Sequence, residues 1–373
     1  METLMADLEK GENSGVIVKV RPLDFRVGAE TGIQYEIRVP NGDWKLWKPT
    51  DEWQRRRSAS GQLGYDTNSC VTFSGNNTLE AQLRFLIDSG KVPEEAMNFL
   101  RDGGYFDEDG NQNFSDWFGA NTNGTTVNGN DLGSFWEGIR KNGLLPQGDG
   151  HKPNDFNTNE EWLNSALVTD VMRDKAKRFL MYFTVGYEWV VLEQAGRWDL
   201  FAKHLKQAPL HIAVGTGKDW NRKDGKPVQP VDGIRLNHAI AYWDQDENID
   251  HDILDHYEPF MKELAWPYYI PYAIKGVLSV RTEPPAEPPF VYVFNVNLKM
   301  GMQNSFEVQQ LQKALQFLGY MKKGVFGPYG PQTAFAVAKF QASNKIIDPD
   351  GAGVNFGPKT RAAMNRALSG DPR

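Results

Sequence analysis

The feature that most constrains the fold of this chain is a proline-rich segment, Pro284-Pro285-Ala286-Glu287-Pro288-Pro289, in the last third of its 373 residues. Proline lacks a backbone N–H and holds φ nearly fixed, so such a run is stiff and extended and cannot continue a sheet. The chain is also longer than most single domains. We therefore expect a domain over residues 1–281, a linker over 282–304 and a small domain over 305–373.

Composition excludes several classes of protein. Hydrophobic residues make up 40% and charged residues 24%, which is typical of a globular protein. The net charge of -7 disfavours nucleic acid and anionic membranes as partners. No apolar run approaches the roughly 18 residues of a membrane span, and the N-terminal sequence has no apolar core of a secretory signal. We expect no membrane partner, no nucleic-acid partner and no signal peptide.

The spacing of apolar residues indicates helices early and strands late in the large domain. Helical spacing predicts helices, whereas alternation or short apolar runs predict strands. Such patterns predict an α+β fold. The expected helices cover 69–87, 132–142 and 160–194, and the expected strands lie within 15–50, 209–214, 233–243 and 276–280.

Cys70 is the only cysteine, so the chain has no internal disulfide. It follows residues 66–69, which are all potential helix caps, and it lies at the start of a predicted helix. A helix N-terminus favours the thiolate form of a cysteine. A lone cysteine is nevertheless more often buried packing. Cys70 is therefore a candidate nucleophile only if a base is available elsewhere.

The second half of the chain offers such a base. His238 opens the apolar segment NHAIAYWD, and Asp255 in ILDHY offers a side-chain acceptor that can hold an imidazole in one tautomer. The remaining histidines of this region, His251 and His256, match no zinc-binding spacing and are expected to be solvated loop residues. We predict neither a metal ion nor a cofactor.

The segments DTNSCVTFS, NHAIAYWD and ILDHY, in that order, resemble the cysteine, histidine and third-residue motifs of papain-like cysteine peptidases. PLHIAVGTG resembles the strand that leads towards the histidine in that family. FSDWFGANTNGTT and IRKNGLLP resemble its phage-encoded and metagenomic branch. The resemblance covers about residues 15–280. It implies a papain-like domain with a helical part and an antiparallel sheet or barrel part.

The resemblance also implies a role for each motif residue. Cys70 would attack the scissile carbonyl, and His238 would form the ion pair with it and protonate the leaving amine. Asp255 would orient His238. Tyr257 would take the place of the tryptophan that shields this third residue and would border the substrate.

A glutamine upstream of the cysteine stabilises the oxyanion in this family, and two glutamines are candidates here. Gln62 is nearer to the cysteine, whereas Gln54 fits the Pro-x-x-Glu-x-Gln pattern of phage-type relatives more closely. Three positions depart from the family pattern: Val71 stands where many relatives have tryptophan, Asp255 replaces the commoner asparagine, and the glutamine-to-cysteine spacing is long.

The C-terminal segments VQQLQKALQFLGY, GVFGPYGPQTAFAVAKFQ and GPKTRAAMNRAL resemble a peptidoglycan-binding domain. The resemblance covers about residues 305–368. Helical spacing predicts three short helices, with Leu311, Leu315, Val337 and Phe340 in their common core. The implied partner is bacterial peptidoglycan.

Together these features predict a cysteine peptidase anchored to the bacterial cell wall, of the phage endolysin type, acting after lysis on peptidoglycan or on surface protein. The alternative is a non-catalytic wall-binding or virion structural protein that keeps a papain-like scaffold. A zinc-dependent wall peptidase is disfavoured because the sequence offers no suitable ligand set.

Overall fold

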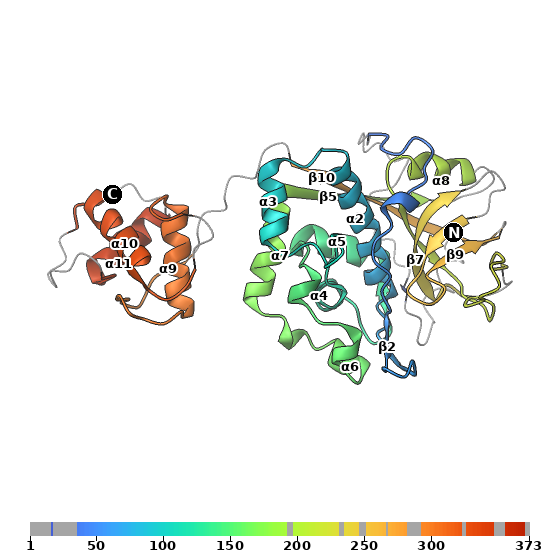
Figure 1. The fold of residues 1–373 in the computed structure, drawn as a ribbon, viewed down its shortest axis with the longest axis horizontal. Helices are drawn as coiled ribbons and strands as arrows, with labels where there is room; N and C mark the ends of the chain where they lie inside the picture. Colours follow the sequence, from blue (N-terminus) through green and yellow to red (C-terminus); the bar gives the residue numbers. More distant parts are fainter. Residues whose placement is uncertain are drawn as a thin grey trace. The chain divides into compact units, whose positions relative to one another are not determined.

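The computed structural model describes residues 16–17, 36–191, 197–230, 235–245, 251–265, 268–281, 292–322, 326–346 and 355–369. They belong to two compact units, Met1–Glu283 and Pro284–Arg373, each considered by itself (Figure 1). The proline-rich segment lies outside the described residues, as does the rest of the expected linker up to residue 291.

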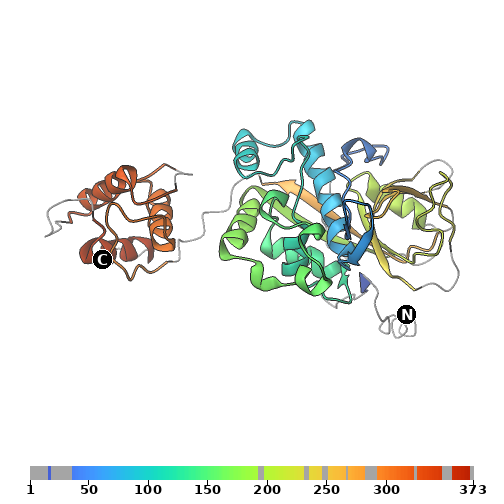
Figure 2. The same cartoon turned by 60° about the horizontal axis from the view of Figure 1, so that its bottom comes forward.

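The first unit contains a helical part built around α2 (Cys70–Asp88). This helix is buried along nearly its whole length because α4 and α5 pack on one side and strands β6, β7 and β10 on the other (Figure 2). Gly75 marks the closest approach to α5, since a Cβ there would lie 2.1 Å from Cε1 of Phe135. The other helices of this part are α3 (Glu94–Asp102), α4 (Asp116–Thr122), α5 (Leu132–Asn142), α6 (Asn159–Trp162) and α7 (Asp170–Tyr182).

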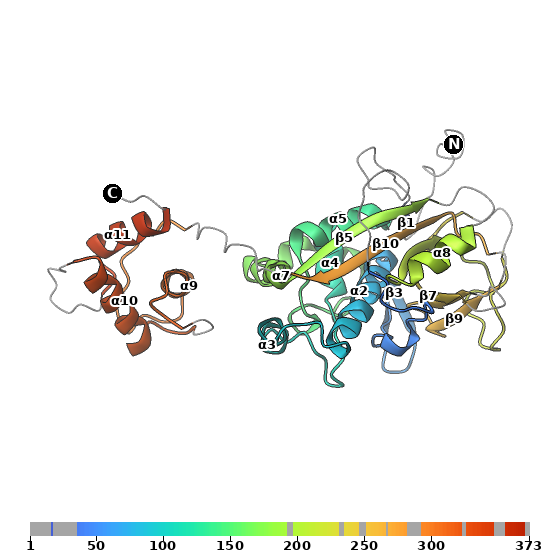
Figure 3. The same cartoon turned by 90° about the horizontal axis from the view of Figure 1, so that it is seen from above.

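A six-stranded antiparallel sheet forms the rest of the unit, in the order β5-β10-β6-β7-β8-β9. Helix α8 (Arg197–Leu205) packs against β7, and the long strands β5 and β10 run beside α5 (Figure 3). The strands are β5 (Phe183–Val191), β6 (Leu210–Val214), β7 (His238–Gln245), β8 (His251–Leu254), β9 (Met261–Leu264) and β10 (Tyr272–Val280).

Shorter elements connect these two parts. Strands β2 (Arg55–Arg57) and β3 (Leu63–Asp66) form a hairpin just before α2, and β1 (Val16–Ile17) pairs in parallel with β4 (Asn130–Asp131). The hairpin lies between Gln54 and Cys70 and accounts for the long spacing between them. Short 3-10 helices are η1 (Lys45–Trp47), η2 (Gln147–Asp149), η3 (Pro153–Asp155) and η4 (Ser165–Leu167).

The second unit consists of α9 (Phe306–Phe317), α10 (Pro331–Ser343) and α11 (Pro358–Ser369) around one apolar core. A buried glutamine, Gln312 of α9, ties a loop of this unit to α10. Nε2 of Gln312 donates to Thr333 Oγ1 at 2.9 Å and to the carbonyl of Gly327 at 3.0 Å. The predicted core residues are all buried here: Leu311, Leu315, Val337 and Phe340.

The predicted α+β class with a following three-helix unit is confirmed, and so are the helices expected over 69–87 and 132–142. The prediction of helix over 160–194 is wrong at its end, because residues 183–191 pair with β10 along their full length. Of the strands expected within 15–50, β1 (Val16–Ile17) is present, residues 15 and 18–35 lie outside the described residues, and no strand forms within 36–50. Isolated hydrogen bonds hold residues 36–50 in place, such as the bond that Trp44 Nε1 donates to the Leu205 carbonyl at 2.6 Å. The only regular element there is the short 3-10 helix η1.

Candidate active site

Cys70 is the first residue of α2 and is fully buried. Ser69 is the N-cap, but its hydroxyl donates to the Thr67 carbonyl and accepts from Trp162 Nε1 at 3.0 Å. It therefore makes no side-chain cap to the helix. The side-chain cap predicted from residues 66–69 is therefore not formed; the amides of Thr72 and Phe73 donate to the Ser69 carbonyl, and the sulfur lies at the positive end of the helix dipole.

His238 and Asp255 meet because β7 and β8 are neighbours in the sheet. His238 is the first residue of β7, and Asp255 directly follows β8, so the antiparallel register brings their side chains together. Nε2 of His238 donates to Asp255 Oδ1 at 2.5 Å. Cys70 lies near enough to the imidazole to raise the pKa of His238. The structure thus brings all three predicted residues into one chain of contacts.

The charges of this group favour a protonated imidazole. Burial would lower the pKa of His238, but the charge of Asp255 and hydrogen bonds to Asp255 and Cys70 raise it to about 10. Burial would raise the pKa of Asp255, yet the neighbouring cations, His238 foremost, hold it well below its usual range. The pair is therefore an imidazolium and a carboxylate at neutral pH.

Trp220 also contacts Asp255, and the sequence patterns did not single it out. Its Nε1 donates to Asp255 Oδ2 at 2.7 Å, and its ring stands edge-on to His238 with 5.6 Å between centroids. The tryptophan beside Asp255 is thus Trp220, whereas Tyr257, for which the resemblance implied that place, lies against His238 with 5.3 Å between ring centroids. In the sequence, Trp220 stands alone within a polar segment, and this is the one feature that could have pointed to it.

The two candidate glutamines occupy different places. Gln54 is buried, and its Nε2 donates to Asp66 Oδ1 at 2.9 Å and to the Tyr257 hydroxyl at 2.5 Å. The Tyr257 hydroxyl in turn donates to Asp66. Gln62 is exposed at the turn end of the hairpin, where its backbone pairs with Ser58. Gln54 is thus the glutamine that adjoins His238, through Tyr257.

The remaining histidines of this region are not solvated, contrary to the sequence-based expectation. His251 and His256 are fully buried, and His256 Nε2 lies 2.9 Å from Asn77 Nδ2. Burial lowers the pKa of His256 to about 3, so it is a neutral packing residue. Within the described ranges, no group of three or more His, Cys, Asp and Glu side chains is arranged to hold a metal ion. None of the described helices is long and apolar enough to cross a bilayer.

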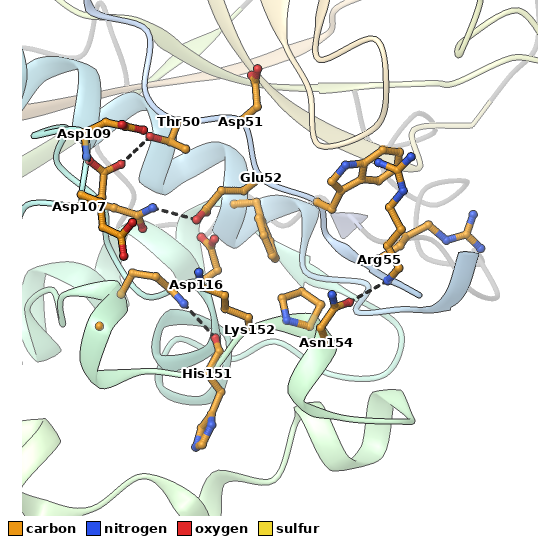
Figure 4. A pocket seen from close by; sticks show the side chains of 18 of the residues that line it. Thr50, Asp51, Glu52, Arg55, Asp107, Asp109, Asp116, His151, Lys152 and Asn154 are labelled. Atoms are coloured by element: carbon orange, nitrogen blue, oxygen red, sulfur yellow. Dashed lines mark hydrogen bonds between the residues drawn. The ribbon is translucent and has the colours of Figure 1, made fainter. Parts of the chain in front are cut away.

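A surface pocket of about 920 Å³ lies beside the N-terminal half of α2 and includes Phe73 in its lining. Figure 4 shows Glu52 and Asp116 pointing towards each other in this pocket, whose lining also includes Arg55 and Lys152. Burial raises the pKa of Asp116 well above its usual value, and the charge of Glu52 raises it further.

Comparisons with known proteins bear on both units. Residues 304–364 match the family model described as "Putative peptidoglycan binding domain". No curated protein sequence matches the chain.

Three solved structures illustrate the similarity of the first unit. The cysteine protease xylellain from Xylella fastidiosa is 16% identical, over 73% of this chain and 98% of its own, with a TM-score of 0.43. Digestive procathepsin L 3 from Tenebrio molitor larval midgut is 13% identical, over 74% of this chain and 78% of its own, with a TM-score of 0.40. The bromelain protease from Ananas comosus is 13% identical, over 65% of this chain and 98% of its own, also with a TM-score of 0.40.

Proposed function

We propose that this protein is a papain-like cysteine peptidase that hydrolyses peptide bonds at the bacterial cell wall. The observation that carries the proposal is the buried hydrogen bond from His238 to Asp255 close to Cys70, whose sulfur lies at a helix N-terminus. A thiol paired with an imidazolium in this position is activated as a nucleophile. Packing alone does not require a histidine and a carboxylate beside a buried cysteine.

The geometry supports a two-step mechanism. The Cys70 thiolate attacks the carbonyl carbon, and the imidazolium of His238 gives its proton to the leaving amine, which leaves a thioester. His238, now neutral, then takes a proton from water as the water attacks the thioester, and the acid product leaves as the ion pair re-forms. Asp255 keeps Nε2 of His238 protonated and the ring in place throughout.

Gln54 is the proposed side-chain donor to the oxyanion, together with the backbone N–H of Cys70. In the present structure both N–H groups of its amide are engaged, one by Asp66 and the other by Tyr257. The amide must therefore turn away from Asp66 when a substrate carbonyl arrives. This observation also favours the alternative, a wall-binding or virion structural protein that keeps the scaffold without catalysis.

The second unit supports anchoring to the wall, because residues 304–364 match a peptidoglycan-binding family model. Anchoring raises the local concentration of wall substrates at the catalytic unit. The proposed substrates are peptidoglycan stem peptides or proteins of the cell surface. The phage-type motifs within residues 114–146 support the narrower proposal of a bacteriophage endolysin that reaches the wall from outside or after lysis.

The test is the rate of Cys70 alkylation by iodoacetamide between about pH 4 and pH 9, in the full chain and in His238→Ala. Because the chain has one cysteine, the label reports this site alone. We expect rapid alkylation of the native chain in mild acid and its loss in His238→Ala. If both proteins react as an ordinary thiol with a pKa near 8.5, catalysis is excluded and the structural alternative stands.

A further inference from the structure

A buried lysine lies on the far side of Asp255 from His238. Lys262 belongs to β9, and its side chain is 1% exposed. Its Nζ donates to Asp255 Oδ2 at 2.5 Å and to the Tyr257 carbonyl at 2.6 Å. It also lies 5.5 Å from the ring centroid of Trp220. An ammonium group so enclosed is costly unless an anion compensates it, and Asp255 is the anion it contacts.

Asp255 therefore lies between two cations. His238 binds Oδ1, whereas Lys262 and the Trp220 indole bind Oδ2. The sequence resemblance places a neutral asparagine at this position in most relatives, and a carboxylate here adds a buried negative charge. Lys262 compensates this negative charge, because a carboxylate and an ammonium group in contact have no net charge as a pair.

We propose that Lys262 is a positioning residue of the active site, which offsets the charge of Asp255 so that this carboxylate orients His238 without holding its proton too tightly. The inference rests on the proposed peptidase function. An imidazolium bound to an uncompensated carboxylate gives up its proton less readily, and His238 must release that proton to the leaving amine. Lys262 thus sets the acidity of the general acid.

The other charged groups around this cluster are few. His238 faces Cys70 on α2 and Asp255 after β8, with the Tyr257 ring against it. Lys262 also borders a pocket of about 500 Å³ whose charged lining residues are Arg222, Lys223, Lys226, Asp252, Glu258 and Glu263. Of these, Arg222 pairs with Asp224, and Lys223 with Glu258. Asp255 is thus the carboxylate in direct contact with both His238 and Lys262 among the described residues.

The experiment measures the pKa of His238 by NMR titration of its ring Cε1–H signal in the full chain, assigned by the loss of that signal in His238→Ala. The measurement is made in a Cys70→Ala background, so that the thiolate does not contribute. In that background we compare Lys262→Met, Lys262→Met with Asp255→Asn, and the control Lys275→Met. Lys275 is a second buried lysine of the same sheet, paired with Glu188 rather than with Asp255.

We expect Lys262→Met to raise the pKa of His238 by roughly one unit or more, because one opposite charge is removed from the carboxylate. Asp255→Asn added to Lys262→Met should bring the pKa back to or below its starting value, and Lys275→Met should leave it unchanged. If Lys262→Met fails to fold, Lys262→Gln keeps a donor to Asp255 without the charge and should give the same shift.

An unchanged His238 pKa in the folded Lys262 variant would overturn the inference, as would an equal shift in Lys275→Met. The proposed peptidase function is judged separately, by alkylation of Cys70 in the native chain. Rapid acid alkylation without a Lys262 effect therefore rejects only the positioning role. If Cys70 is alkylated slowly but Lys262→Met still raises the pKa of His238, the peptidase function is rejected, and Lys262 only balances the charge of Asp255.

Discussion

The raised pKa of His238 predicts a specific dependence of stability on pH. The pKa is about 10 in the folded chain against about 6.5 in the unfolded chain. A group whose pKa is raised by folding stabilises the fold fully below its unfolded pKa, and this contribution is lost as the pH rises through its folded pKa. At about 1.36 kcal/mol per unit, the interactions of the His238 imidazolium contribute about 4–5 kcal/mol near pH 6 and almost nothing near pH 10.

The assay is denaturant unfolding at pH 6, 8 and 10 of the Cys70→Ala chain and of the same chain with His238→Gln, so that titration of the thiol does not contribute. The free energy of unfolding of the chain with His238, minus that of the chain with His238→Gln, should fall by up to about 4 kcal/mol across this range. Taking the difference removes the titration of lysines and tyrosines that both proteins share. A difference that stays constant or grows with pH would refute the buried imidazolium, and with it the charge distribution derived for the site.

Three further predictions follow from single contacts. Trp220→Phe keeps the ring against His238 but removes the indole donor to Asp255, so it should lower the free energy of unfolding by about 1–3 kcal/mol; an unchanged value in denaturant unfolding would show that the bond is not formed. Gly75→Ala places a Cβ 2.1 Å from the Phe135 ring and should cost about 1–3 kcal/mol or more, visible as a lower Tm, whereas an equal or higher Tm would contradict the close packing of α2 on α5. Gln312→Ala removes the hydrogen bonds to Thr333 and Gly327, so it should destabilise the second unit by about 1–3 kcal/mol and reduce the fraction of protein that sediments with purified peptidoglycan. Cys70 alkylation should stay unchanged. Full retention of binding and stability would argue against a structural role for Gln312.

Much of the site could be predicted because its residues begin or end regular elements. Cys70 starts a helix with clear apolar spacing, and His238 starts a short strand of buried residues, so both positions were visible from local patterns. Neither pattern predicts that Cys70 and His238 lie close together in space. It depends on the packing of α2 against β7, which only the order of the motifs suggested.

The missed features depend on contacts between distant segments. Trp220 and Lys262 reach Asp255 from a loop and from an edge strand, and neither lies in a pattern that distinguishes it from ordinary surface residues. The strand over 183–191 continues directly from α7, and its pairing with β10 overrides a sequence that also suits a helix. The choice between Gln54 and Gln62 likewise needed the hairpin that separates Gln54 from Cys70.

The separation of Cys70 and His238 along the chain has a consequence for protein synthesis. A ribosome that adds about 5–20 residues per second makes the cysteine on the order of ten seconds before the histidine. During that interval Cys70 has no base, because His238 and Asp255 have not yet been made. On the proposed function, Cys70 therefore becomes a nucleophile only when β7 joins the sheet against α2, and chains that end before His238 are inactive.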